Sequence, residues 1–182
     1  TYGFRKFVLP LGYEAAQLRR YFLDYEAMTR DFTVRLGDRA GQIDFRGPEQ
    51  HPEWEVSLVD TGLRTDKAGR IARVADYLTA DRFCVTYGDG VGDVDLAALM
   101  AFHAAHGKTA TITAFQPKHY QYGTMTAGDD GRVTEYVQYP ELPYWINAGF
   151  MVFERAALDW MRGGDDMALE TGVMQEMLAV GE

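Results

Sequence analysis

Hydrophobic and polar positions repeat with two different periods along the chain, which predicts an alternation of strands and helices. Short apolar or alternating runs predict strands at residues 7–11, 32–36, 54–59, 83–87, 109–115, 132–137 and 146–153. Apolar side chains at helical spacing predict helices at residues 13–25, 70–78, 95–106, 156–161 and 168–180. Residues 37–50 are polar and patternless, so a loop is expected there.

The order of these elements indicates the fold class. Strands that alternate with helices through short connections are typical of parallel strands joined by right-handed crossovers. The sequence therefore predicts an α/β domain of three layers with a mostly parallel sheet. A chain of 182 residues is long enough for one good core and too short for two full-sized domains, so we expect a single domain over residues 1–182.

The composition restricts the classes of partner and the cellular compartment that we expect. Lys and Arg number 18 against 27 Asp and Glu, a formal net charge of −9, which argues against a nucleic-acid-binding surface. The single cysteine, Cys84, fits a reducing compartment, and its place within an apolar strand predicts a core position. Since no apolar run approaches the ~20 residues of a membrane span and no signal peptide opens the chain, we expect a cytoplasmic protein without membrane contact.

The loop after the strand at residues 83–87 is the first candidate for chemistry. Asp89 stands there between Gly88 and Gly90. Ligands of open α/β sheets bind at the carboxyl ends of strands, and a carboxylate in that position suits Mg²⁺ that bridges substrate phosphates. The alternative is a plain Gly-Asp turn, with Asp95 capping the following helix.

A second candidate loop follows the strand at residues 54–59. It contains Asp60, Thr61 and Gly62, and it leads past Arg64 and Arg70 into a helix. Backbone NH groups near a helix start, supported by arginines, can hold a nucleotide base or phosphate. An Asp-Thr-Gly turn without a ligand remains the alternative.

The four histidines, His51, His103, His106 and His119, have neither metal-ligand spacing nor a nucleophile partner in the sequence. We therefore expect them at the surface or at helix ends.

Five segments, at residues 54–62, 69–77, 86–95, 102–108 and 146–150, resemble the sugar-1-phosphate nucleotidyltransferases and follow that family's order. The Asp-Thr-Gly element after a Trp-bearing strand is similar to the cytidylyl branch in particular. The resemblance implies a three-layer, Rossmann-like nucleotide-diphospho-sugar transferase fold. It implies condensation of an NTP, expected to be CTP, with a sugar 1-phosphate such as glucose 1-phosphate, which gives an NDP-sugar and pyrophosphate with Mg²⁺ as the cofactor.

Together with the two loops, the resemblance implies roles for ten residues. Asp89 is the expected catalytic and metal-binding residue. The expected nucleotide-binding residues are Asp60, Thr61, Gly62, Arg64 and Gly88. The expected sugar-phosphate-binding residues are Gly123, Gln138, Tyr139 and Asn147.

The chain departs from the family pattern in three places. The family's Gly-rich phosphate loop is expected before residue 1 and its second metal aspartate beyond residue 182, so the chain corresponds to a catalytic domain without these two parts. The family's Glu-Lys-Pro appears here as Gln138, Tyr139 and Pro140. Because a phosphate-binding lysine is lost, we expect either weak use of glucose 1-phosphate or a different acceptor, which stacks on Tyr139 and whose phosphate is held by Lys118 or Arg155.

Two other functions stay open. One is a non-catalytic or altered-specificity homologue, which the missing lysine motivates. The other is a nucleotide-sugar glycosyltransferase in which Asp93 and Asp95 form the metal-binding Asp-x-Asp, although Asp89 is the acid at the strand tip. Assembly as a homo-oligomer is also left open.

Overall fold

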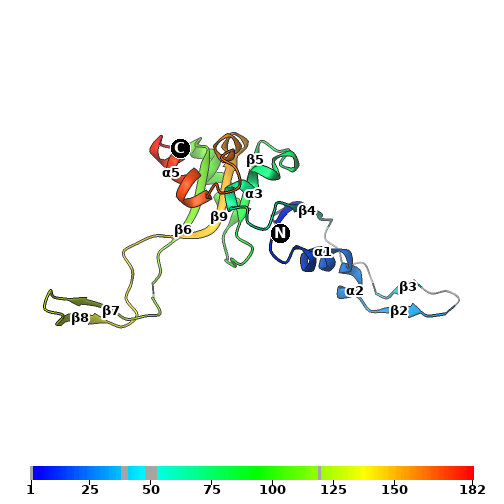
Figure 1. The fold of residues 1–182 in the computed structure, drawn as a ribbon, viewed down its shortest axis with the longest axis horizontal. Helices are drawn as coiled ribbons and strands as arrows, with labels where there is room; N and C mark the ends of the chain where they lie inside the picture. The colour runs from blue at the N-terminus through cyan, green and yellow to red at the C-terminus, as the bar shows by residue number, and fades with distance from the viewer. Residues whose placement is uncertain (1, 38–40, 48–52, 119) are drawn as a thin grey trace. The chain divides into compact units, whose positions relative to one another are not determined.

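The computed structural model describes residues 2–37, 41–47, 53–118 and 120–182. Its helices and strands are labelled in Figure 1, and the chain divides into two compact units. Unit one contains Thr1–Thr79 and Leu158–Gly181, and unit two contains Ala80–Ala157 with Glu182. His51 and His119 lie outside the described residues.

Unit one is built on a parallel strand pair. Strands β1 (Lys6–Leu11) and β4 (Glu55–Asp60) run side by side, with Leu11 opposite Asp60. The other regular elements of this unit are α1 (Ala15–Leu23), α2 (Tyr25–Thr29), α3 (Lys67–Arg73), the short 3₁₀ helix Ala75–Tyr77, the π-helical turn Leu169–Val173 and α5 (Met174–Ala179). The strands and helices predicted between residues 7–25 and 54–78 are confirmed, with shifted ends.

A hairpin also belongs to unit one. Strands β2 (Phe32–Arg35) and β3 (Gln42–Phe45) pair antiparallel, and the Phe32 and Phe45 ring centroids lie 5.8 Å apart. The expected loop at residues 37–50 is wrong for residues 42–45. Most side chains of β3 are exposed, so its sequence carries little of the hydrophobic pattern that marks a buried strand.

Unit two contains a three-stranded sheet in the order β5 (Arg82–Thr86), β9 (Ile146–Glu154), β6 (Ala110–Phe115). Strand β9 is antiparallel to both neighbours, so β5 and β6 run in the same direction on either side of it. The two strands that α4 (Leu96–His106) connects are therefore parallel to each other, as expected. Among the described residues, however, β1 and β4 are the only parallel pair, so a mostly parallel sheet is not observed. Periodicity marks the buried faces of a strand and does not identify its neighbours.

Strand β9 provides much of the core of unit two. Its consecutive residues Met151, Val152 and Phe153 are all buried, as expected for a central strand that is covered on both faces. The Phe83 and Phe153 rings stack with their centroids 5.7 Å apart. After β9 the chain turns into the 3₁₀ helix Arg155–Met161.

Helix α4 begins and ends where its sequence predicts. The Asp95 carboxylate accepts hydrogen bonds from the Ala97 and Ala98 NH groups, both at 3.0 Å, and Gly107 ends the helix with φ 66°. Two expectations in this region are wrong. Cys84 is exposed rather than in the core, because it points away from the buried side of β5 that holds Phe83, and its sulfur lies 3.7 Å from the Met100 sulfur. His103 is fully buried, because it follows Leu99 by one helical turn on the inner face of α4.

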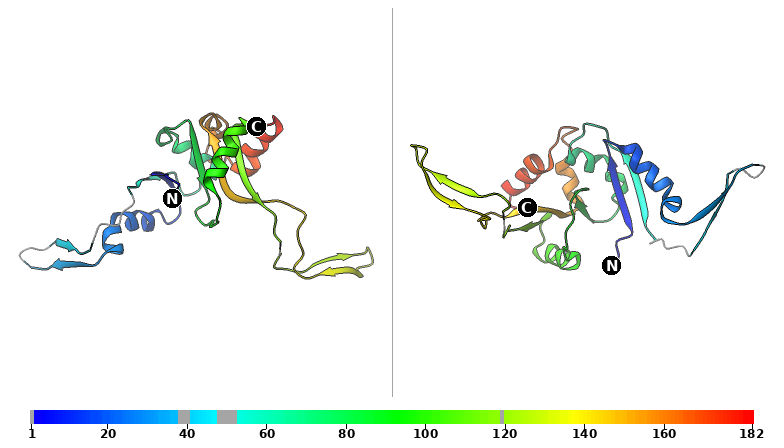
Figure 2. Two further views of the ribbon diagram at one scale, coloured as in Figure 1. Left: turned by 180° about the vertical axis from the view of Figure 1, so that it is seen from behind. Right: turned by 90° about the horizontal axis from the view of Figure 1, so that it is seen from below.

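A second hairpin connects β6 to β9 (Figure 2). Strands β7 (Thr124–Ala127) and β8 (Val133–Val137) pair antiparallel, and every residue in both strands is exposed. The chain segments that lead to it are also paired, since the Tyr120 NH donates to the Pro140 carbonyl at 3.1 Å and the Leu142 NH to the Pro117 carbonyl at 3.4 Å. Strand β8 was expected and β7 was not.

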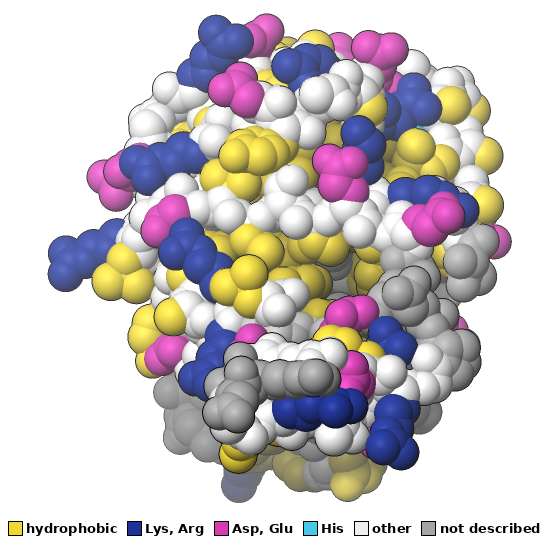
Figure 3. Space-filling model, turned by 90° about the vertical axis from the view of Figure 1, so that its right-hand side faces the viewer, with side chains coloured by type: hydrophobic (Ala, Val, Ile, Leu, Met, Phe, Trp, Pro, Cys, Tyr) yellow, Lys and Arg dark blue, Asp and Glu magenta, His cyan; other side chains and the backbone are white. Residues whose placement is uncertain are grey.

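The described helices include none long and apolar enough to cross a membrane. On the face shown in Figure 3, acidic and basic side chains are interspersed and hydrophobic side chains lie between them.

Candidate active site

The carboxyl end of β5 leads into the turn that holds Asp89. The Gly90 NH closes this turn on the Tyr87 carbonyl at 3.4 Å, and the Asp89 side chain is exposed. No atom lies within 4 Å of the place that a Cβ on Gly88 would take. A ligand can therefore approach the backbone beside the carboxylate, as the sequence predicts for a phosphate-bound metal ion.

Asn147 lies at the same edge of the sheet, next to this turn. It is the second residue of β9 and stands opposite Ala114 of β6. Its Nδ2 donates to the Tyr87 hydroxyl at 3.0 Å, and its Oδ1 accepts from the Gly149 NH at 2.8 Å. The structure thus brings the Asp89 turn and Asn147, which are distant in sequence, to one end of the β5–β9 pair.

Tyr87 is the residue that joins the two segments, and sequence reasoning missed it. Its NH donates to the Gly149 carbonyl at 3.3 Å, and its ring covers the Gly149 α-carbon. A Cβ on Gly149 would lie 2.7 Å from the Tyr87 ring, and φ is +79° there, so only glycine fits. The signal in the sequence was the place of Tyr87 at the tip of β5, directly before the Gly-Asp-Gly turn.

Asp89 is the carboxylate that directly follows the strand at this edge. The described residues contain no group of three or more His, Cys, Asp or Glu side chains that could hold a metal ion. Asp95 is engaged as the cap of α4. Mg²⁺ commonly takes one or two protein carboxylates and completes its shell with water and substrate phosphates, and Asp89 fits an ion of that kind.

The second predicted loop, in unit one, is held by its own side chains. Asp60 accepts from the Gly62 NH at 3.0 Å and pairs with Arg19 at 3.5 Å. Thr61 is fully buried, and its hydroxyl donates to the Leu11 carbonyl at 2.9 Å. The buried Thr61 side chain therefore stabilises the turn from within, whereas the Asp60 side chain bonds the Gly62 NH and remains 65% exposed.

Two arginines of α3 stabilise this turn through hydrogen bonds. Arg70 donates to the Thr61 hydroxyl at 2.8 Å and to the Leu11 carbonyl at 3.0 Å. Arg73 donates to the Thr61 carbonyl at 2.7 Å. Arg64 is exposed, whereas Gly62 is half-buried with φ +89°. Of the two arginines proposed for phosphate binding, Arg64 faces solvent and Arg70 is used internally.

The hairpin of unit two brings Gly123 and Gln138 together. The Tyr136 hydroxyl donates to Gln138 Oε1 at 2.6 Å, and a Cβ on Gly123 would lie 2.5 Å from that hydroxyl. Tyr139 is 59% exposed and adopts φ 54°. No hydrogen bond between described residues joins this group to Asn147, which lies in the three-stranded sheet.

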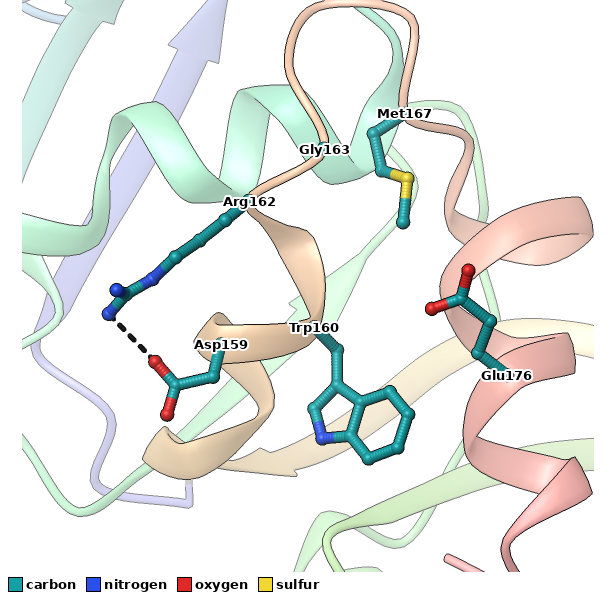
Figure 4. A pocket seen from close by; sticks show the side chains of 6 residues that line it. All are labelled: Asp159, Trp160, Arg162, Gly163, Met167 and Glu176. Carbon is teal, nitrogen blue, oxygen red and sulfur yellow. Dashed lines mark ion pairs between the residues drawn. The ribbon is translucent and has the colours of Figure 1, made fainter.

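Unit one also contains a shallow pocket of about 350 Å³ (Figure 4). The Trp160 indole faces the space between Met167 and Glu176, and Asp159 pairs with Arg162 at 2.7 Å on the other side. Gly163 completes the lining. None of the residues expected from the sequence to form the site lines this pocket.

Comparisons with known proteins agree on one family. Residues 40–176 match the family described as Nucleotidyl transferase. A probable glucose-1-phosphate cytidylyltransferase of Bacillus subtilis (strain 168) is 32% identical over 181 residues, which cover 100% of this chain and 69% of the relative. The glucose-1-phosphate cytidylyltransferase of Salmonella typhi is 34% identical over 161 residues, which cover 87% of this chain and 61% of the relative.

Solved structures show the same fold. The crystal structure of HddC from Yersinia pseudotuberculosis is similar with a TM-score of 0.57 and 16% sequence identity, over 92% of this chain and 63% of that chain. The family match and this likeness together indicate a Rossmann-like α/β fold.

Proposed function

Because the chain belongs to the nucleotidyl transferase family, we propose that the protein containing it transfers a nucleotidyl group from an NTP to a sugar 1-phosphate. A phosphate oxygen of the sugar 1-phosphate attacks the α-phosphorus of the NTP. The bond from that phosphorus to the bridging oxygen breaks, and pyrophosphate leaves. The names of the relatives favour CTP and glucose 1-phosphate as the first pair to test.

The observation that carries this proposal is the turn at the tip of β5. Asp89 has an exposed carboxylate between two glycines, and Gly88 leaves open space beside it. Transfer between phosphates depends mainly on positioning and on neutralising charge, and a bound Mg²⁺ would supply that neutralisation. Asp89 would hold the ion against the phosphates of the nucleotide.

The other residues of the proposal bind the two substrates. Asn147, at the same edge of the sheet, would exchange hydrogen bonds with a sugar hydroxyl. Gln138, held by Tyr136, would contribute a second amide. Arg64 and the backbone at Gly62 would contact the nucleotide. Asp60 and Thr61 would shape that loop from within.

The glycosyltransferase alternative has less support. It requires Asp93 and Asp95 to bind a metal ion together, yet the Asp95 carboxylate accepts two backbone hydrogen bonds at the start of α4. The non-catalytic alternative rests on the replacement of the family's lysine by Tyr139, and activity measurements distinguish it directly.

The test uses the full-length protein with a panel of NTPs and sugar 1-phosphates, and pyrophosphate release is measured. Asp89→Asn keeps the shape of the side chain and removes its charge, so we expect turnover to fall roughly 10²–10³-fold, as for loss of one electrostatic group in a transition state. Asp93→Asn, at another exposed acid of the same loop, is the control and should keep near-normal turnover. Equal turnover of wild type and Asp89→Asn would contradict the role of Asp89.

If no combination of wild-type protein, NTP and sugar 1-phosphate releases pyrophosphate, the non-catalytic alternative is favoured instead.

A further inference from the structure

The side-chain amide of Asn147 is fixed in one orientation. A free asparagine amide can turn by 180°, which exchanges its oxygen and nitrogen. Here the Gly149 NH is a donor, so Oδ1 must face it, at 2.8 Å. Nδ2 then donates to the Tyr87 hydroxyl at 3.0 Å. One amide hydrogen and one lone pair remain, and the side chain is exposed.

Tyr87 is itself held in place by β9. Its ring lies over the α-carbon of Gly149, and its NH donates to the Gly149 carbonyl at 3.3 Å. It directly follows Thr86, which pairs with Phe150. The phenol oxygen therefore has a fixed position relative to Asn147.

We propose that Tyr87 is a positioning residue for sugar recognition, because its hydroxyl, bonded to Nδ2, holds the Asn147 amide in the orientation that the Gly149 NH selects. This inference rests on the proposed function. Without the phenol, Nδ2 loses its acceptor, and the amide is held only through the hydrogen bond from the Gly149 NH to Oδ1, about which it can swing. A hydroxyl group of the sugar then finds the amide displaced from its binding position part of the time. The effect falls on binding of the sugar 1-phosphate and leaves binding of the NTP unchanged.

The first variant is Tyr87→Phe in the full-length protein. It keeps the ring over Gly149 and removes only the hydroxyl. We expect KM for the sugar 1-phosphate to rise about 3–10-fold, as for the loss of one neutral hydrogen bond, with KM for the NTP and the melting temperature unchanged. Tyr77→Phe, which removes a hydroxyl from a half-exposed tyrosine of unit one, is the matched control and should match wild type.

A double-mutant cycle separates positioning from direct contact. Asn147→Ala should raise KM for the sugar 1-phosphate, and Tyr87→Phe should add nothing in that background. Additive effects of the two changes would overturn the inference, as would an unchanged sugar KM in Tyr87→Phe while pyrophosphate release continues.

Absence of pyrophosphate release by the wild type defeats the proposed function, and then the orientation is measured without turnover. The Asn147 side-chain amide NMR signals, assigned by their loss in Asn147→Ala, should shift in Tyr87→Phe and not in Tyr77→Phe. Unchanged signals would overturn the positioning role.

Discussion

Two histidines and a threonine of unit two form a hydrogen-bonded chain in which each proton has a definite place. The Lys108 NH donates to His106 Nδ1 at 2.9 Å, so His106 carries its proton on Nε2, 2.6 Å from the Thr111 hydroxyl. Thr111 in turn donates to His103 Nδ1 at 2.7 Å, and His103 Nε2 donates to Glu154 at 3.1 Å. All these groups are satisfied when both imidazoles are neutral.

This arrangement determines how His103 responds to acid. Burial lowers the pKa of His103 below its ordinary value of 6.5, although the hydrogen bond to Glu154 opposes that shift. The Arg82 guanidinium, bound to the Glu154 carboxylate at 2.8 Å, lowers the pKa of Glu154 from 4.5. In both cases the unfolded chain takes up a proton before the native protein does. Stability is therefore complete above the ordinary pKa and is lost as pH falls below it.

We predict that the free energy of unfolding decreases between pH 7.5 and pH 5.5, because His103 is protonated in the unfolded chain first. Each pKa unit of separation is worth about 1.4 kcal/mol within that window. His103→Gln keeps a donor and cannot ionise, so its loss over the same interval should be smaller. Urea unfolding at the two pH values measures both. His106→Gln, in the same chain of bonds, is the control, and a pH dependence of His103→Gln equal to wild type would contradict the prediction.

The sequence contained a signal for the burial of His103 that our prediction did not use. His103 follows Leu96 and Leu99 at helical spacing, and the structure places Leu99 and His103 on the buried side of α4 while Phe102 is 64% exposed. The periodicity of the apolar positions thus marked His103 as inward. Its partners Thr111 and Glu154 lie on β6 and β9, and only the folded sheet brings them to it.

At the scale of secondary-structure elements, Arg70 and Arg64 have different roles in the turn after β4. Arg70 lies against Gly12, where a Cβ would be 2.5 Å from the guanidinium, and it holds Thr61 and Leu11. Arg64, in the loop that follows the turn, is exposed.

We predict that Arg70→Met lowers the free energy of unfolding by roughly 1.5–3 kcal/mol, since charged hydrogen bonds to Thr61 and Leu11 are lost. Arg64→Met should change stability by no more than about 0.5 kcal/mol and should instead raise KM for the NTP. Urea unfolding and steady-state kinetics on both variants test this division. If Arg70→Met were as stable as wild type, the turn would not depend on the hydrogen bonds of Arg70.

The two paired segments that lead to the β7–β8 hairpin favour one replacement for the family's phosphate-binding lysine. Backbone bonds between Tyr120 and Pro140 and between Leu142 and Pro117 bring Lys118 alongside the segment that contains Tyr139. Arg155 follows the far end of β9, about 25 Å along the strand from Asn147. Of the two cations considered from the sequence, Lys118 is the one placed beside the altered motif.

We therefore predict that Lys118→Gln raises KM for the sugar 1-phosphate about 10–100-fold, through loss of a charge-assisted hydrogen bond to phosphate. Arg155→Gln should leave it unchanged. Tyr139→Lys restores the family's cation and should rescue the Lys118→Gln variant. Failure of that rescue, or an equal effect of Arg155→Gln, would argue against Lys118.

A Gln138→Glu, Tyr139→Lys double variant should gain efficiency with glucose 1-phosphate over wild type.

The strands that the sequence did not predict are β3 and β7, and both belong to exposed hairpins. A strand with a buried face shows alternation, whereas all four residues of β7 are exposed and face no core that would select their side chains. The pairing of β7 with β8 is visible only in three dimensions.

For the molecule as a whole, the sequence predicted the α/β class, the direction of β5 relative to β6, and the family that the comparisons confirm. It did not predict that β9 lies between those strands. The grouping of Asp89, Tyr87 and Asn147 at one edge depends on that insertion, which explains why Tyr87 was missed. The single domain over residues 1–182 and the assembly state remain predictions.

The central place of β9 has a consequence for synthesis on the ribosome. Arg82 of β5 pairs with Glu154, 72 residues later in the chain. Strands β5 and β6 therefore emerge first and have no neighbour to complete their sheet until β9 has left the exit tunnel. Contacts so distant in sequence slow folding and leave strand edges open in the interval. Until the central strand arrives, the nascent chain therefore exposes the edges of β5 and β6, and open strand edges favour aggregation.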